Sequence, residues 1–385
     1  MRPRVLFISN GAGEDAIASL IGSRLNRVEA EAMPTVGQGA AYQGVLPLVG
    51  PRQAPMPSGG LVNDSPLSHI TRDLRSGLLT LLLRQFRFLR QVRRQYQLFV
   101  VVGDVFALLN AFAGLRPLLF IGTAKSVVHH RYSWFERLAM RQLADRVLTR
   151  DEPTAADLRR AGIRAAWVGN PMMDALEPTG IDLPLNGNLP WIALFPGSRV
   201  EAYAELARML DVYGLLWQGG DRARAVVVVA DSLQLERLVP PGWQLNASPT
   251  ERGMVGELCR EGLPSVLLVR RVLGDVLAHC QLVLGQAGTA NEQAAGKGLP
   301  VLAYGPGGEK RMSWYRFRQK GLLGEAVEVV EDRPEVIVAA LSRLLRDPEE
   351  RHRRGAVGRE RMGPPGGAAR MAAWIESLAH GQPPP

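Results

Sequence analysis

The chain has 385 residues, of which 46% are hydrophobic and 22% charged. This balance is typical of globular proteins and argues against general disorder, collagen and coiled coil. The length predicts two domains, because single cores rarely exceed roughly 250–300 residues. Two cysteines are too few for a disulfide framework or a multi-cysteine zinc site and fit a reducing cytoplasm. No apolar run is long enough to cross a bilayer, and residues 5–8 read as a first buried strand rather than part of a signal peptide.

The formal net charge is +9. A basic surface attracts phosphates, whether they belong to nucleic acid, nucleotides or anionic lipid headgroups. The charge by itself does not choose among these three.

Short apolar runs alternate with helical patterns along the first half. The predicted strands are 5–8, 98–102, 118–121, 147–148 and 167–168, and the helices between them include 16–25, 134–143 and 154–161. Continuous apolar strands that alternate with helices predict a parallel sheet covered on both faces.

The pattern breaks at residues 177–190, which are rich in Pro, Gly and Asn and read as a linker. A second alternation follows, with strands at 191–195, 225–230, 265–269, 282–284, 301–303 and 326–330 and helices at 201–217, 272–279 and 334–345. We therefore expect an α/β protein with two Rossmann-like domains facing across a cleft. Its parts would be 1–176, the linker, 191–361, and a tail over 362–385 that holds a helix at 368–378 and ends frayed.

The segment 282–304 reads as strand, glycine turn, helix and strand. The first strand ends at Gly285, Gly288 supplies the turn, and Thr289 or Asn291 can cap the helix. Such a turn places free backbone N–H groups and the positive end of a helix at the carboxyl edge of a parallel sheet, where phosphates bind. The alternative is an ordinary turn in which glycine serves packing.

A second turn of this kind follows the strand 191–195, where Arg199 could pair with a diphosphate or simply begin a solvated helix. Two such turns in one half together favour a nucleotide site.

The turn after the first strand is acidic instead. Glu14 and Asp15 suit a hydroxyl-bearing acceptor and a general base, although each could equally complement the helix dipole. Asp104 follows the strand 98–102, at the edge where ligands of open α/β sheets bind; its alternative role is to cap the next helix.

No Asp-x-Asp triplet occurs, the six histidines show no metal spacing, and no P-loop is present. These absences favour a site without a metal ion, in which arginine and helix dipoles hold the phosphates.

Residues 72–94 combine seven arginines with many leucines and phenylalanines. A basic, strongly apolar helix of this kind is typical of a membrane interface, and a core helix with an arginine-lined outer face is the equal alternative. Residues 310–320 mix cations with aromatic side chains. No nucleic-acid-binding module is recognisable, so lipid headgroups are favoured there over nucleic acid.

Four motifs occur in an order that matches a known family. They are Ala12-Gly-Glu14, Val168-Gly-Asn-Pro-Met-Met-Asp174, Phe195-Pro-Gly-Ser-Arg199 and the segment from Ala287-Gly-Thr-Ala290 through Pro300-Val-Leu-Ala-Tyr304. They resemble the motifs of GT-B glycosyltransferases, and most closely those of the lipid-A-disaccharide synthase family in its divergent "related" branch. The resemblance covers most of the chain.

The resemblance implies an inverting transferase that uses a UDP-sugar as donor substrate, without a metal or other cofactor. Asp104 would be the base, with Glu14 or Asp15 as second choices. The donor site would comprise Gly197, Ser198, Arg199, Gly288, Thr289 and Ala290, with Glu292 or Gln293 at the ribose. The acceptor would be a membrane lipid, which places the protein at the cytoplasmic face of the cell membrane, held by the 72–94 region. The resemblance leaves open whether the chain forms a homodimer.

This sequence departs from the family at three places. Gln293 stands where Glu is usual, and Ala12 stands where the related muramyl-lipid transferases have His. The signature around the base is reduced to Gly103-Asp104-Val105. Two alternatives therefore remain, a UDP-sugar 2-epimerase and a non-catalytic protein that binds nucleotide or lipid on the same fold.

Overall fold

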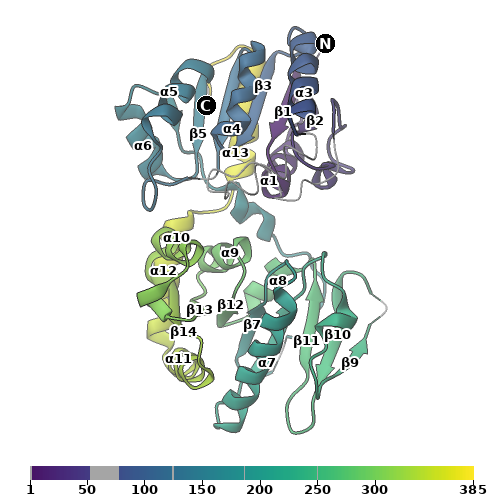
Figure 1. The fold of residues 1–385 in the computed structure, drawn as a ribbon, viewed down its shortest axis with the longest axis vertical. Helices are drawn as coiled ribbons and strands as arrows, with labels where there is room; N and C mark the ends of the chain where they lie inside the picture. Colours follow the sequence, from purple (N-terminus) through teal and green to yellow (C-terminus); the bar gives the residue numbers. More distant parts are fainter. Residues whose placement is uncertain (1, 53–77, 124, 186, 249) are drawn as a thin grey trace. The chain divides into compact units, whose positions relative to one another are not determined.

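A computed structural model describes residues 2–52, 78–123, 125–185, 187–248 and 250–385. The chain divides into two compact units. Unit 1 is Met1–Asp174 together with Pro365–Pro385, and unit 2 is Ala175–Pro364. Both units are α/β (Figure 1).

The sheet of unit 1 has six parallel strands in the order β2-β1-β3-β4-β5-β6. Their bounds are β1 Arg4–Ser9, β2 Glu29–Pro34, β3 Leu98–Gly103, β4 Leu118–Gly122, β5 Arg146–Thr149 and β6 Ala165–Ala166. The chain moves from β1 to one side and then returns to add β3 on the other. The carboxyl ends of β1 and β3 therefore form the switch point of this sheet, where ligands of open α/β folds bind.

Helices cover both faces of this sheet. Their bounds are α1 Ala12–Gly22, α3 Leu78–Val92, α4 Val105–Leu108, α5 Trp134–Leu143, α6 Glu152–Arg160 and α13 Gly367–Ala379, with short 3-10 turns η1 Ala40–Tyr42, η2 Leu109–Ala113 and η3 Pro171–Leu176. One core joins α3, α4, η2, α5 and α6 to one face of the sheet, and another joins α1 and α13 to the opposite face.

The C-terminal helix α13 is therefore an integral part of unit 1 (Figure 1). Ala368, Met371 and Ile375 are buried against strands β1 and β3, and Glu376 accepts hydrogen bonds from the backbone N–H groups of Asn26 and Arg27, both at 2.6 Å. The sequence predicted this helix but left it as a separate tail. Within the predicted linker, Leu183 and Leu185 are buried in unit 2.

The sheet of unit 2 has eight strands in the order β14-β13-β12-β7-β8-β11-β10-β9. Their bounds are β7 Trp191–Phe195, β8 Arg224–Val228, β9 Gln244–Ala247, β10 Gly253–Cys259, β11 Val266–Arg270, β12 Leu282–Gly285, β13 Val301–Gly305 and β14 Val327–Glu331. All pairs are parallel except at one edge, where β10 runs antiparallel to β11 and β9. The switch point lies between β7 and β12, because the strands after β7 extend to one side and β12, β13 and β14 to the other.

The helices of unit 2 are α7 Ala202–Gln218, α8 Leu273–His279, α9 Thr289–Lys297, α10 Trp314–Leu323, α11 Pro334–Arg346 and α12 Pro348–Met362, with turns η4 Leu235–Leu238, η5 Gly308–Arg311 and η6 Gly324–Ala326. Helices α7 and α11 share one core with β7, β8 and β12, while α8 and α9 contact β7 and β12.

Helix α12 packs backbone to backbone on α9. A methyl group added at Gly358 would come within 2.7 Å of the backbone carbon of Ala295, and one added at Gly355 within 2.9 Å of that of Gly298. Two glycines on one helix face therefore permit the close approach. Because α12 has almost no apolar stripe, the hydrophobic pattern gives no sign of it, and the sequence analysis missed it.

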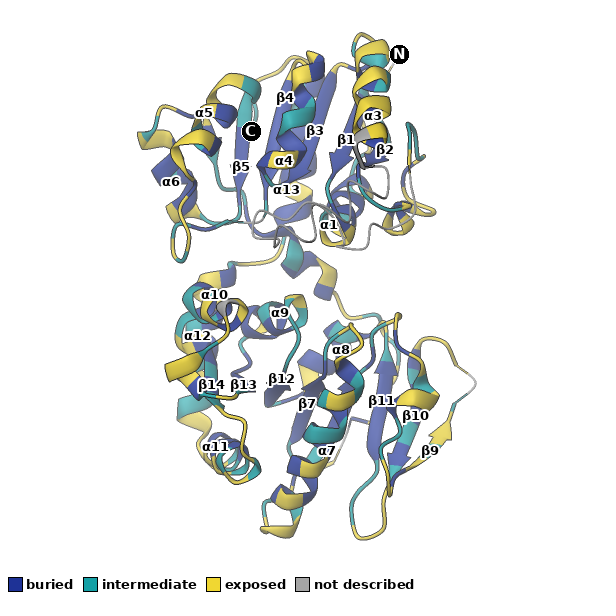
Figure 2. Cartoon of the chain, viewed as in Figure 1, coloured by how far each residue is buried: buried dark blue, intermediate teal, exposed yellow. Residues whose placement is uncertain are grey.

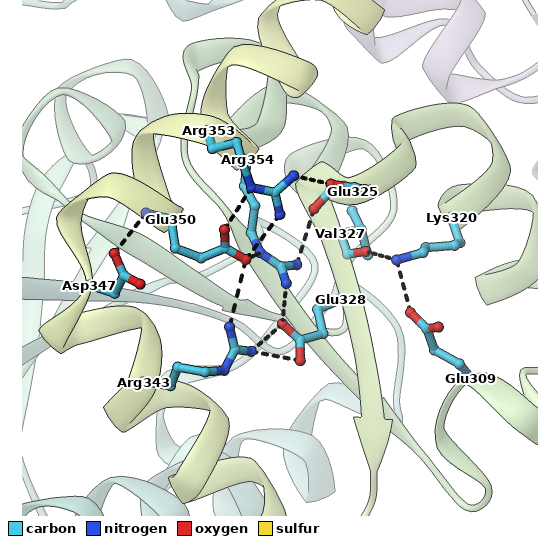
Figure 3. A network of polar contacts seen from close by, with 10 residues as sticks. All are labelled: Glu309, Lys320, Glu325, Val327, Glu328, Arg343, Asp347, Glu350, Arg353 and Arg354. Carbon is cyan, nitrogen blue, oxygen red and sulfur yellow. Dashed lines mark hydrogen bonds and ion pairs between the residues drawn. The ribbon is translucent and has the colours of Figure 1, made fainter.

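Ion pairs hold the other side of α12 (Figure 3). Glu350 accepts from Arg353 and Arg354, both at 2.7 Å, and these bonds lower its pKa to about 2. Arg354 also reaches Glu328 on β14 at 3.0 Å, and Arg343 on α11 reaches the same carboxylate at 2.6 Å. Single ion pairs near the surface contribute little to stability, but this network joins α11, α12 and β14.

Candidate functional site

Unit 2 contains a cavity of about 810 Å³ at the switch point between β7 and β12. The two strands pair in parallel up to Phe195 and Gly285, and the next residue, Gln286, donates its backbone N–H to the carbonyl of Phe195 at 2.8 Å. This pairing holds the turns that follow the two strands next to each other, so they form neighbouring walls of the cavity.

The turn after β7 needs glycine. Gly197 has φ +110°, which side chains with a Cβ rarely adopt. Next to it, the carbonyl of Ser198 accepts a hydrogen bond from the Ser232 hydroxyl at 2.7 Å. Arg199 follows on the exposed surface and lines the cavity. A hydrogen bond from a side chain therefore holds the backbone of the turn, while Arg199 stays exposed.

The turn after β12 is held by a buried amide. Asn291 is fully buried and its Nδ2 donates to the carbonyl of Gly285 at 3.0 Å. Gly288 is the N-cap residue of α9, so the first backbone N–H groups of that helix stand at the cavity wall. The hydroxyl of Tyr315 on α10 fills the space where a Gly288 side chain would be. This combination of amides and helix dipole suits an anion.

All eight residues predicted for the donor site line this one cavity: Gly197, Ser198, Arg199, Gly288, Thr289, Ala290, Glu292 and Gln293. Gln293 is buried and Glu292 half-buried. Arg199 and Gly288 thus share one cavity, although they are 89 positions apart in the numbering of the chain. That these residues bind a UDP-sugar stays a prediction.

Several cavity residues were missed by the sequence analysis. Arg316 and Gln319 of α10 line it, and so do Gln286 and the pair Glu205–Tyr304, in which the Tyr304 hydroxyl donates to the carboxylate at 2.7 Å. Arg316 lies in the 310–320 stretch, for which the sequence analysis favoured binding of lipid headgroups. Nothing in the sequence around this arginine indicates that it is buried at the cavity wall.

In unit 1, Asp104 lies at the switch point. Its Oδ1 accepts from the Asn10 side-chain amide at 2.9 Å and from the backbone N–H of Ala107 at 3.1 Å. The first bond joins the loops after β1 and β3, and the second caps α4. Burial raises the pKa of the Asp104 carboxyl, even though these donors act to lower it. Asp104 thus serves as a cap and also lies at the ligand-binding edge of the sheet.

The two other acidic candidates differ in position. Glu14 is half-buried, and its Cγ would be 3.3 Å from a methyl group added at Gly103, the residue before Asp104. Asp15 is only 4% exposed and accepts from the Ser9 hydroxyl at 2.6 Å, which lies 2.6 Å from the Tyr42 hydroxyl. Burial raises the pKa of Asp15 to about 6. Glu14 therefore groups with Asp104, whereas Asp15 belongs to a buried polar cluster.

The predicted amphipathic helix is α3, and residues 72–77 lie outside the described part. Leu81, Gln85 and Leu89 face the core, while Leu83 and Phe86 are exposed. The neighbouring elements η2, α4 and α5 are on the same face of the sheet (Figure 2). We call the exposed apolar side chains of α3, α4, η2 and α5 the apolar surface of unit 1. They are Leu82, Leu83, Phe86, Phe106, Phe112, Trp134, Phe135 and Leu138.

Within the described ranges, no three His, Cys, Asp or Glu side chains gather in a way that could hold a metal ion. Across the same ranges, no helix combines the length and apolar character needed to span a membrane.

By sequence, the chain matches no protein-family model and no curated protein. By structure, it is similar to a putative UDP-N-acetylglucosamine 2-epimerase from Listeria monocytogenes, with a TM-score of 0.62, 15% identity and coverage of 100% of this chain and 99% of that one. The S. aureus MnaA–UDP co-structure gives a TM-score of 0.61, 14% identity and 99% coverage of both chains. CalG4, the calicheamicin glycosyltransferase, gives a TM-score of 0.60 and 15% identity, with 98% of both chains covered.

At these identities the likeness concerns the fold. It bears out the predicted α/β architecture with two Rossmann-like domains. The narrower resemblance to the lipid-A-disaccharide synthase family stays a prediction. The chain has the two-domain α/β fold known as GT-B.

Proposed function

We propose that this protein is an enzyme that acts on a UDP-sugar bound in the cavity of unit 2. The observation that carries the proposal is the gathering of all eight predicted donor residues at one switch-point cavity. The UDP bound in one structural neighbour and the UDP-GlcNAc named with others support the same substrate class.

The cavity offers the groups that a diphosphate needs. Backbone N–H groups at Gly288 and Thr289 begin α9, and the exposed Arg199 supplies a positive charge. Fixed amides aimed at the diphosphate would stabilise the charge that develops as UDP departs. Gln293 or Glu292 would bind the ribose hydroxyls.

Transfer of the sugar to a lipid is the first of two reactions that fit. The acceptor oxygen would form a bond to the anomeric carbon as the bond from that carbon to the diphosphate breaks, with inversion. UDP would leave with the electron pair, and Asp104 would take the acceptor proton. Its raised pKa suits a base.

The apolar surface of unit 1 favours a lipid acceptor. Phe112 is 64% exposed and Trp134 77% exposed, and α3 adds the exposed cations Arg84, Arg87 and Arg90. The segments 78–92, 105–113 and 134–143 contain a single acidic residue, Glu136, which is buried. Exposed aromatic and aliphatic side chains beside arginines are complementary to an anionic membrane surface.

The triple variant Leu83→Ser, Phe112→Ser, Trp134→Ser should bind anionic vesicles at least about 10-fold more weakly than the unchanged protein, because it loses much of the apolar area that would enter the interface. Flotation with phosphatidylglycerol and with phosphatidylcholine vesicles measures this. Leu215→Ser, at a residue 45% exposed in unit 2, is the control and should float normally. Equal flotation of triple variant and control would contradict the membrane role.

Epimerisation of a UDP-sugar at C2 is the second reaction, and the 2-epimerases among the structural neighbours favour it. It needs no lipid. Incubation with a panel of UDP-sugars separates the two: an epimerase converts its substrate in buffer alone, whereas a transferase releases UDP only when a lipid extract is added. Nucleotide binding without turnover under both conditions would indicate the non-catalytic alternative.

Asp104→Asn should reduce turnover at least about 100-fold while UDP affinity stays within about 3-fold, since loss of a general base affects the chemical step. Asn caps helices as well as Asp does, so α4 should keep its cap. Glu14→Gln is the matched comparison and should affect turnover less. Unchanged turnover in Asp104→Asn would reject the assignment.

A further inference from the structure

Arg316 is a buried arginine, and no carboxylate among the described residues of unit 2 forms a hydrogen bond with it. It is 8% exposed and lines the cavity. Its Nη1 donates to the side-chain oxygen of Gln319 at 2.8 Å and its Nη2 to that of Gln286. Both acceptors are neutral amides. Among the described carboxylates, Glu205 influences this guanidinium through space and not through a hydrogen bond.

A comparison within the same unit shows how unusual this is. The side chain of Arg354 is similarly sheltered, at 12% exposure, but it pairs with Glu350 at 2.7 Å and Glu328 at 3.0 Å. A buried charge without a counter-ion is costly, and burial accordingly lowers the pKa of Arg316. The site as folded therefore carries an electrostatic cost that an anion entering the cavity would remove.

The two glutamines that accept hydrogen bonds from Arg316 also fix the turn between β12 and α9. Gln319 donates from Nε2 to the carbonyls of Ala287 at 3.3 Å and Gly288 at 3.2 Å, and Gln286 donates to the carbonyl of Tyr304 at 3.0 Å. The guanidinium is thereby fixed beside the turn that begins α9. Arg199, by contrast, is exposed and not held in this way.

We propose that Arg316 is the fixed counter-ion of the nucleotide diphosphate, held in the cavity wall by Gln286 and Gln319, and that it makes the site selective for diphosphates over uncharged nucleosides. This inference rests on the proposed UDP-sugar site and adds to it a residue that distinguishes ligands by charge. The alternative is that Arg316 only ties α10 to the 286–288 turn.

The test is calorimetric titration of Arg316→Met with uridine, UMP, UDP and inorganic pyrophosphate, together with thermal melting. We expect UDP affinity to fall at least about 30-fold and pyrophosphate binding to disappear, because the charged partner is lost, while uridine affinity is unchanged. The melting temperature should stay the same or rise, since an unpaired buried charge has been removed. Arg222→Met, which removes an exposed arginine stacked on Trp217, is the control and should bind all four normally.

A second variant tests the same idea without removing the arginine. Gln286→Glu would place a carboxylate on Nη2 of Arg316 and should raise the melting temperature while UDP affinity falls. Equal losses for uridine and UDP with a lower melting temperature, or unchanged UDP affinity, would overturn the proposal. If the unchanged protein binds pyrophosphate through Arg316 but no uridine nucleotide, the proposed function fails while the anion site stands.

Discussion

A Gly288→Ala variant is expected to bind UDP at least about 10-fold more weakly than the unchanged protein, since inserting a methyl group into a well-packed contact costs about 1–3 kcal/mol. The added methyl would overlap the Tyr315 hydroxyl, so either Tyr315 or the turn that begins α9 must move. Movement of the turn displaces the N–H groups that would hold the diphosphate. Titration calorimetry measures the loss.

A double variant identifies the cause. In Gly288→Ala, Tyr315→Phe the hydroxyl is gone, and the next atom of the ring, Cζ, would be 3.4 Å from the new methyl, which is an ordinary contact. UDP affinity should recover to that of Tyr315→Phe alone. Gly214→Ala serves as the control, because its methyl would only meet Leu263 Cδ1 at 3.5 Å. If the double variant stays as weak as Gly288→Ala, the overlap with Tyr315 is not the reason.

Gly358→Val is expected to lower the free energy of unfolding by at least about 3 kcal/mol, at the upper end of what overpacking costs. Its side chain would press on the backbone of Ala295, with the carbonyl carbon 2.7 Å from the first added atom. Backbone cannot rotate away as a side chain can. Because α9 would be pushed from β12, UDP affinity should fall together with stability.

Ala356→Val is the matched control, since Ala356 lies on the exposed face of the same helix. It should cost no more than about 0.7 kcal/mol, which is the upper range of the difference in helix propensity between alanine and an ordinary residue such as valine. Urea unfolding of both variants gives the comparison. Because valine is a better helix former than glycine, helix propensity alone would favour Gly358→Val. A loss in Gly358→Val no larger than that in Ala356→Val would show that the contact with α9 does not limit this position.

The donor turns could be predicted because their signals are local. Strand, glycine and helix follow one another within about ten residues at 191–201 and again at 282–290, so the sequence places both at the carboxyl edge of a sheet. Strand bounds were close for the same reason; the exception was 167–168, since the short β6 is Ala165–Ala166. Strands β2, β9 and β10 were missed because none of them is a continuous apolar run.

The rest depends on contacts between distant residues. The bond from Asn26 to Glu376 spans 350 positions, and no periodicity indicates that α13 completes the core of unit 1. Helix α12 depends on Gly355 and Gly358, whose packing partner lies on another helix. The inward turn of Arg316 depends on Gln286, 30 positions earlier. Tertiary packing, rather than local pattern, decides each of these.

The binding mode of the cavity is tested by one calorimetric titration of the 385-residue chain with UDP and with uridine, both in EDTA. We expect UDP to bind at least about 10-fold more tightly than uridine without any divalent cation, because amide dipoles and guanidinium groups hold the phosphates. UDP binding no tighter than that of uridine, or tight binding only after Mg²⁺ is added, would contradict this binding mode.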